Sequence, residues 1–177
     1  MEDPSRPGSQ QAVKHADSIM VDMVAEEATA SGGVEMGLSF PQQGKEPLAL
    51  SLKGDSAAYN SKEREFEADG KEGAPVEIKG EDVGLTCAQV KGSVGETGSL
   101  ETLSALGGVS FSGKTATYRI KGKAQEVAYS PREQTVTATG DFSGTVSPLA
   151  GEGGVRSWEN ADTAVFHLDG GNGDVNG

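Results

Sequence analysis

The sequence predicts an all-β protein in which an antiparallel sheet is rolled or folded over on itself and stays open at both ends. The first observation is a strict period of two across residues 125–146, where Val136, Ala138, Phe142 and Val146 share one face and threonines occupy the other. Such alternation is typical of half-buried strands. The second is composition, because 26 glycines and only 34% hydrophobic residues favour a thin β architecture with many turns.

The third observation is an internal repeat. Segments that begin at Asp17, Asp55 and Gln125 can be laid over one another without a gap. The matched columns are Val21, Tyr59 and Tyr129; the turn residues Asp22, Asn60 and Ser130; Ala28, Phe66 and Val136; Ala30, Ala68 and Ala138; and Gly32, Gly70 and Gly140. One strand pair cannot bury its own apolar face, so we expect successive copies to stack around a narrow apolar interior.

The chain begins with a polar, Pro- and Gly-containing segment. We expect residues 1–14 to be a disordered leader and residues 15–177 to form a single domain. That domain reads as two similar halves, about residues 16–85 and 86–170.

The first half contains two long strands. Small or apolar residues occupy seven consecutive even positions from Ala28 to Phe40, which predicts one strand. Leu50 and Leu52 belong to the next, and Gly54 shifts its phase, as a β-bulge or a corner would. Residues 22–29 are the best helical candidate, but the repeat overrules a helix there.

The second half repeats this pattern more loosely. A third copy is expected to begin at Gly80, with Val83 and Leu85 as its inward residues, and residues 91–101 to form an insertion. Gly122 is expected to shift the strand phase as its counterpart in the first half does. The last unit starts near residue 161, and we expect its final strand to be weak or frayed.

The residue inventory argues against catalysis. A net charge of −12 disfavours nucleic acid as a partner, because phosphate binding draws on clustered Lys and Arg. Cys87 is the only cysteine, so no disulfide framework exists, and its alternation with Leu85 predicts a small buried side chain. His15 and His167 lie near the two ends of the chain, away from any credible catalytic set. We therefore expect no enzyme activity, no cofactor and no metal site.

The open ends of the predicted sheet favour pairing with another chain. A terminal strand presents unpaired N–H and C=O groups, so it must be capped or paired by another chain. Trp158 follows a Gly-rich loop, and we expect it to pack over an open end or to contact a partner.

Several short motifs together resemble a known family. They are Ala16-Asp17, residues 30–34 and 105–109, Tyr59-Asn60, residues 124–140, and Ala161-Asp162 with Phe166. This pattern resembles the OstA-like (LptA-like) periplasmic lipopolysaccharide-transport bridge proteins and covers about residues 16–170. The resemblance implies a β-jellyroll, or β-taco, fold.

The resemblance also implies a function. It implies a non-enzymatic periplasmic carrier, its signal segment absent from this chain, that shields the acyl chains of lipopolysaccharide or a related glycolipid. The lipid would pass between inner-membrane-anchored and outer-membrane partners by end-to-end β-augmentation, and head-to-tail self-association is a further expectation. The expected ligand contacts are the inward residues Ile19, Val21, Leu50, Leu52, Tyr59, Phe66, Phe111, Tyr118, Ile120, Tyr129, Val136 and Phe142.

Three alternatives stay open from the sequence. One is a structural β-solenoid scaffold with no lipid ligand. Another is the membrane-anchored paralogue with its anchor removed. The third is an acidic carbohydrate-active domain that would use outward carboxylates such as Glu65 and Glu67.

Overall fold

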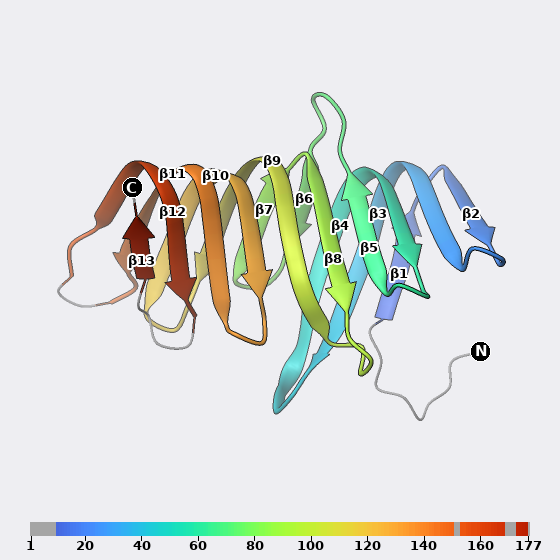
Figure 1. Cartoon of the computed structure of the whole chain (residues 1–177), viewed down its shortest axis with the longest axis horizontal. Helices are drawn as coiled ribbons and strands as arrows, with labels where there is room; N and C mark the ends of the chain where they lie inside the picture. Colours follow the sequence, from blue (N-terminus) through green and yellow to red (C-terminus); the bar gives the residue numbers. More distant parts are fainter. Residues whose placement is uncertain (1–9, 151–152, 169–172, 177) are drawn as a thin grey trace.

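The protein is an elongated antiparallel β structure (Figure 1). The computed structural model describes residues 10–150, 153–168 and 173–176, and within these ranges there are thirteen strands and no helix. The strands are β1 (Gln10–His15), β2 (Ser18–Asp22), β3 (Glu27–Gln42), β4 (Lys45–Asn60), β5 (Glu65–Asp69), β6 (Val76–Lys79), β7 (Val83–Cys87), β8 (Gln89–Val94), β9 (Leu100–Lys114), β10 (Tyr118–Ser130), β11 (Thr135–Pro148), β12 (Arg156–His167) and β13 (Gly173–Asn176). The predicted all-β, folded-over antiparallel fold is confirmed.

The long strands run through two layers. Each of them pairs in one register before a corner and resumes pairing after it, so one strand contributes to both layers. The first layer contains β2, β5, β8, β13 and residues 27–31, 56–60, 100–106, 126–130, 135–139 and 163–167 of the long strands. The second layer contains β1, β6, β7 and residues 34–42, 45–54, 109–114, 118–124, 142–148 and 156–161. Figure 1 shows β1 and β2 at one end of the molecule and β12 and β13 at the other.

Residues with positive φ make the corners. Gly32, Gly107 and Gly140 have φ of 83°, 82° and 80°, a conformation that glycine adopts without steric penalty. The register of β3 breaks between Ser31 and Val34, and that of β11 between Thr139 and Phe142. Because two residues are skipped in each case, the apolar side chains before and after the corner stay on the inner side.

A repeated four-residue turn joins the strand pairs of the first layer. Its last residue lies in the left-handed region each time, with φ of 56° at Glu26, 57° at Arg64 and 51° at Gln134. Asp22 Oδ1 accepts hydrogen bonds from the backbone N–H groups of residues 24 and 25, at 2.9 Å each, and these bonds lower the pKa of Asp22. Asn60 Oδ1 accepts one from the N–H of residue 63 in the same way. These turns follow the turn residues of the predicted repeat, and no helix forms over residues 22–29.

The apolar core fills the space between the layers. It draws on nearly every strand, and its largest fully buried side chains are Phe40, Phe142, Leu52, Ile78, Val34, Val76, Val90, Val109 and Cys87. Cys87 is buried, as the sequence predicted. Nowhere in the described ranges is there a helix long and apolar enough to cross a membrane.

The predicted leader is wrong over residues 10–14. These residues belong to β1, which pairs with β3 from Gln10↔Ser39 to His15↔Glu35. Backbone pairing to the edge of β3 satisfies the amide groups of a segment whose side chains are mostly polar and exposed. Residues 1–9 lie outside the described residues.

The predicted third copy is also wrong, because its residues lie in the second layer whereas the matched Ala57 and Tyr59 lie in the first. Val83 and Leu85 lie on β7 in the second layer, and residues 91–101 are no insertion, because they complete β8, turn and enter β9. Val90 is fully buried on β8, and Gly92 lies directly against the ring of Phe66. A glycine at an inward position carries no apolar signal, which is why this strand was not predicted.

Two further expectations need correction. In β10 the register shifts between Ala124 and Glu126, not at Gly122, whereas the shift predicted at Gly54 in β4 is present opposite Val34. The segment that starts near residue 161 was expected to form a weak or frayed strand. It instead belongs to the 12-residue β12, which pairs with both β11 and β13. That pairing stabilises β12 along its length.

Gly107 and Gly108 form a matched pair that tests a corner. Both have positive φ, so alanine at either position adds backbone strain of about 1–2 kcal/mol. A Cβ at Gly107 would lie 2.6 Å from the Cβ of Ala88, whereas one at Gly108 would meet nothing within 4 Å. We expect Gly107→Ala to lower the free energy of unfolding, measured by chemical denaturation, by about 1–3 kcal/mol more than Gly108→Ala. Equal losses would contradict a close approach at this corner.

Candidate functional site

A hollow opens into the interior at the end formed by β1 and β2. We call it the first hollow; its volume is about 330 Å³. It is lined by Gln11, Val13, Ile19, Ala28, Thr29, Ala30, Met36, Leu38, Leu52, Ala57, Ala58, Tyr59, Phe66, Glu67 and Ala68. Most of these side chains are apolar, because most of them stand at inward positions of β1 to β5. The hollow exists because the small residues Ala28, Ala30, Ala57 and Ala68 fill little of the space between the layers.

A second hollow lies toward the other end. Its volume is about 360 Å³, and it is lined by Thr115, Thr117, Tyr118, Ile120, Val146, Pro148, Ala150, Gly153, Gly154, Arg156, Trp158, Phe166 and His167. Its apolar floor comes from β10, β11 and β12, while threonines, Arg156 and His167 make its rim more polar than that of the first hollow. The two hollows therefore differ in chemistry.

Tightly packed aromatic rings adjoin the second hollow, and Phe166 also lines it. The ring centroid of Phe142 lies 6.3 Å from that of Phe111 and 5.7 Å from that of Phe166. Gly122 makes room for two of these rings, since a Cβ there would lie 2.7 Å from Phe142 Cε2 and 2.9 Å from Phe111 Cζ. The interior is thus apolar along its length, filled by side chains in the middle and hollow toward the ends.

Six of the twelve predicted ligand contacts line the hollows: Ile19, Leu52, Tyr59 and Phe66 in the first, and Tyr118 and Ile120 in the second. Five others belong to the packed core or lie against it: Leu50, Phe111, Tyr129, Val136 and Phe142. Val21 lies on the inner face with Ile19, opposite Ala28, but at the open end its side chain stays 59% exposed and does not line the hollow.

Sequence reasoning missed several lining residues. Met36 and Leu38 line the first hollow, and the period of two had already placed them on the inner face of a strand. Trp158 packs against the core from β12 and lines the second hollow, in line with the expected packing over an open end. Arg156 had no distinguishing signal, since a single arginine after a Gly-rich loop is ordinary.

The β2 edge is both unpaired and apolar. β2 pairs with β3 on one side and with no other described strand. Ile19, Met20 and Val21 on this strand are all more than half exposed, and Val24 in the turn that follows is 96% exposed. An exposed apolar edge of this kind is a template for pairing with another chain.

Burial disfavours ionisation of Cys87 and Tyr129 in the interior. Burial raises the pKa of the Cys87 thiol to about 11, and its Sγ donates a hydrogen bond to the carbonyl of Gln89 at 3.3 Å. Burial likewise raises the pKa of Tyr129. Across the part of the chain that the structure describes, no group of three or more His, Cys, Asp and Glu residues could hold a metal ion.

Comparison with known proteins supports the fold assignment. No protein-family model matches the sequence, and no curated protein gives a significant match. Among solved structures, the chain is similar to LptH of Pseudomonas aeruginosa, the LptA-homologous periplasmic component of the lipopolysaccharide transport device. The TM-score is 0.56 and the sequence identity 16%, over 71% of this chain and 80% of LptH. The fold is LptA-like. At this identity the likeness concerns the fold alone.

Proposed function

We propose that the protein is a non-enzymatic periplasmic carrier that shields the acyl chains of lipopolysaccharide or a related glycolipid and bridges inner- and outer-membrane partners. The observation that carries the proposal is the pair of hollows, which open an otherwise filled apolar interior toward both ends. The LptA-like fold supports it, because LptH is a periplasmic component of lipopolysaccharide transport.

Affinity would come from the burial of apolar chain. Each CH₂ group that leaves water contributes about 0.8 kcal/mol. The first hollow has the size of a small-molecule site, for which about 300–1,000 Å³ is usual, and an apolar lining such a chain requires. This driving force needs no cationic pocket, so the net charge of −12 does not oppose it.

The partners would attach at the ends. The free edge of β2 offers backbone hydrogen bonds and apolar side chains to an added strand, from a membrane-associated transport protein or from another copy of this chain. End-to-end pairing would join the interiors of successive subunits.

A structural scaffold without a lipid ligand is the second candidate. The observation that favours it is the filled interior between the hollows, where Val76, Val90 and Phe142 have no exposed surface. A long acyl chain could cross this region only if the two layers moved apart.

Photo-crosslinking separates the two candidates. A benzoylphenylalanine in place of Tyr59 or Tyr118 adds a reactive group to the first or second hollow without a large change in shape. We expect both variants to capture lipopolysaccharide on irradiation, and a matched variant at Thr137, on the outer face of β11, to capture none. Capture at Thr137 alone, or at no position, would contradict a lipid-carrying interior and favour the scaffold.

Charge on the β2 edge tests the docking proposal. Once another strand pairs with β2, a lysine at Val21 would face the shared interior, where burying its charge is costly. We therefore expect Val21→Lys to abolish the concentration-dependent association seen by sedimentation velocity. The control is Val24→Lys, which adds the same charge in the turn outside the strand. Loss of association in both variants would point to net charge, and retention in both would exclude the β2 edge as a docking surface.

A further inference from the structure

Four cations gather on the outer face of the second layer, where β9 and β10 pair. Between Glu101 and Glu126 the sequence holds no acidic residue, and its four basic residues are Lys114, Arg119, Lys121 and Lys123. All four side chains are exposed, while Ile120 and Ala124 between them are buried. We call Arg119, Lys121 and Lys123, which are spaced about 7 Å apart along one strand, the basic row.

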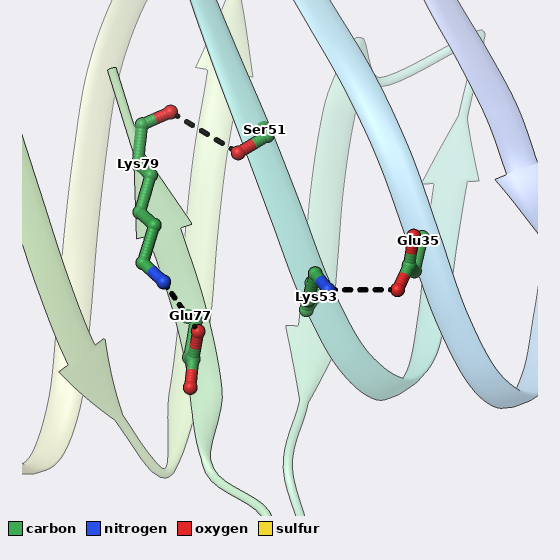
Figure 2. Close-up of polar contacts among 5 residues, drawn as sticks. All are labelled: Glu35, Ser51, Lys53, Glu77 and Lys79. Atoms are coloured by element: carbon green, nitrogen blue, oxygen red, sulfur yellow. Dashed lines mark hydrogen bonds and ion pairs between the residues drawn. The ribbon is translucent and has the colours of Figure 1, made fainter. Parts of the chain in front are cut away.

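Two other lysines of the same layer, Lys53 and Lys79, have acidic partners. Figure 2 shows Lys53 Nζ beside Glu35 at 2.8 Å and Lys79 Nζ beside Glu77 at 3.1 Å, with Ser51 Oγ donating to the Lys79 carbonyl. The Glu35 carboxylate raises the pKa of Lys53, and the lysine lowers that of Glu35. In contrast, no carboxylate of the described residues lies within 4.0 Å of the basic row or of Lys114.

The basic row has no evident structural purpose. Lysines often protect an edge strand from stray pairing, but β10 is paired with β9 on one side and β11 on the other. Arg119 stands directly opposite Lys114, and like charges in that position destabilise a sheet. An external anion would relieve this repulsion.

The neighbours of the row are hydrogen-bond donors. Lys121 lies opposite Ser112 and Thr145, and Lys123 lies opposite Ser110 and Ser143. Lysine, arginine and hydroxyl groups together suit phosphate oxygens and sugar hydroxyls. Around the basic row, the outward positions of the second-layer parts of β9, β10 and β11 carry no aromatic side chain for base stacking and no large apolar side chain for membrane insertion.

The row begins beside the second hollow. Tyr118 lines that hollow, and the next residue, Arg119, points to the opposite side of the strand. The turn that joins Lys114 to Tyr118 forms part of the rim, with Thr115 N–H donating to the Tyr118 carbonyl at 2.8 Å. A molecule with its apolar part in the hollow and a polar head outside could reach the cations around this rim.

We propose that the basic row binds the phosphate groups on the saccharide head of a glycolipid whose apolar chains occupy the second hollow. The inference rests on the proposed lipid-carrying function, and it adds a head-group site on the outer surface. It also qualifies the expectation drawn from net charge, because the excess of acidic residues lies elsewhere in the chain.

The test uses a water-soluble probe, lipopolysaccharide deacylated with alkali so that its phosphates remain. The row variant is R119Q/K121Q/K123Q, and the control K45Q/K62Q/R132Q removes the same charge from three exposed positions in or next to turns. We expect the probe to shift β10 amide resonances of the wild type, and the row variant to bind it at least about tenfold more weakly while the control does not. The dephosphorylated probe should not bind, and added salt should weaken binding by the wild type.

Equal binding by the row variant would overturn the proposal, as would equally tight binding of an acidic peptide, which would indicate a protein partner. Photo-capture of intact lipopolysaccharide at Tyr118 separates this result from the proposed function. Capture without binding of the soluble probe would reject the row and leave the carrier standing. If the probe binds the row but intact lipopolysaccharide is not captured at Tyr118, the second hollow holds no lipid. The row then cannot be assigned to the head of a glycolipid bound there.

Discussion

The fold depends on one backbone constraint: each long strand must leave one layer and enter the other without moving its apolar face outward. Positive-φ corners meet this constraint at Gly32, Gly107 and Gly140, where the chain turns and two residues are skipped in the ladder. Because the skip is even, Ala138 before the corner and Phe142 after it are both buried. The two layers can then share one apolar interior, and its length follows from the number of stacked strand pairs.

Side-chain size decides where that interior is filled. Phenylalanines from β9, β11 and β12 meet beside the second hollow, and Gly122 accommodates two of their rings. Alanines face one another near the β2 end and leave the first hollow. The same architecture therefore combines a stable core with space for an apolar ligand, and the polar rim of the second hollow distinguishes the two ends.

Much of the fold could be predicted from the sequence. The alternation of apolar and polar residues indicates the strands, and the internal repeat indicates the corners and turns. The corners at Gly32 and Gly140, which share one column of the repeat, and the turns after Asp22 and Asn60 lie where the repeat placed them. Prediction was wrong where an inward glycine interrupted the apolar signal, as at Gly92, and where backbone pairing alone orders a polar segment, as in β1. The hollows could not be predicted, because their volume depends on which side chains face one another across the two layers. The sequence shows the basic row as a run without acidic residues. The negative net charge of the whole chain drew attention away from this local excess of positive charge.

The central claim is that the interior admits an apolar chain from its ends. Paramagnetic relaxation by a spin-labelled fatty acid tests it directly, since the label broadens nearby amide resonances. We expect broadening at Leu38 and Tyr59 in the first hollow and at Ile120 and Trp158 in the second, with none at outward Thr137. Broadening confined to the outer surface, with the resonances of both hollows unchanged, would contradict it.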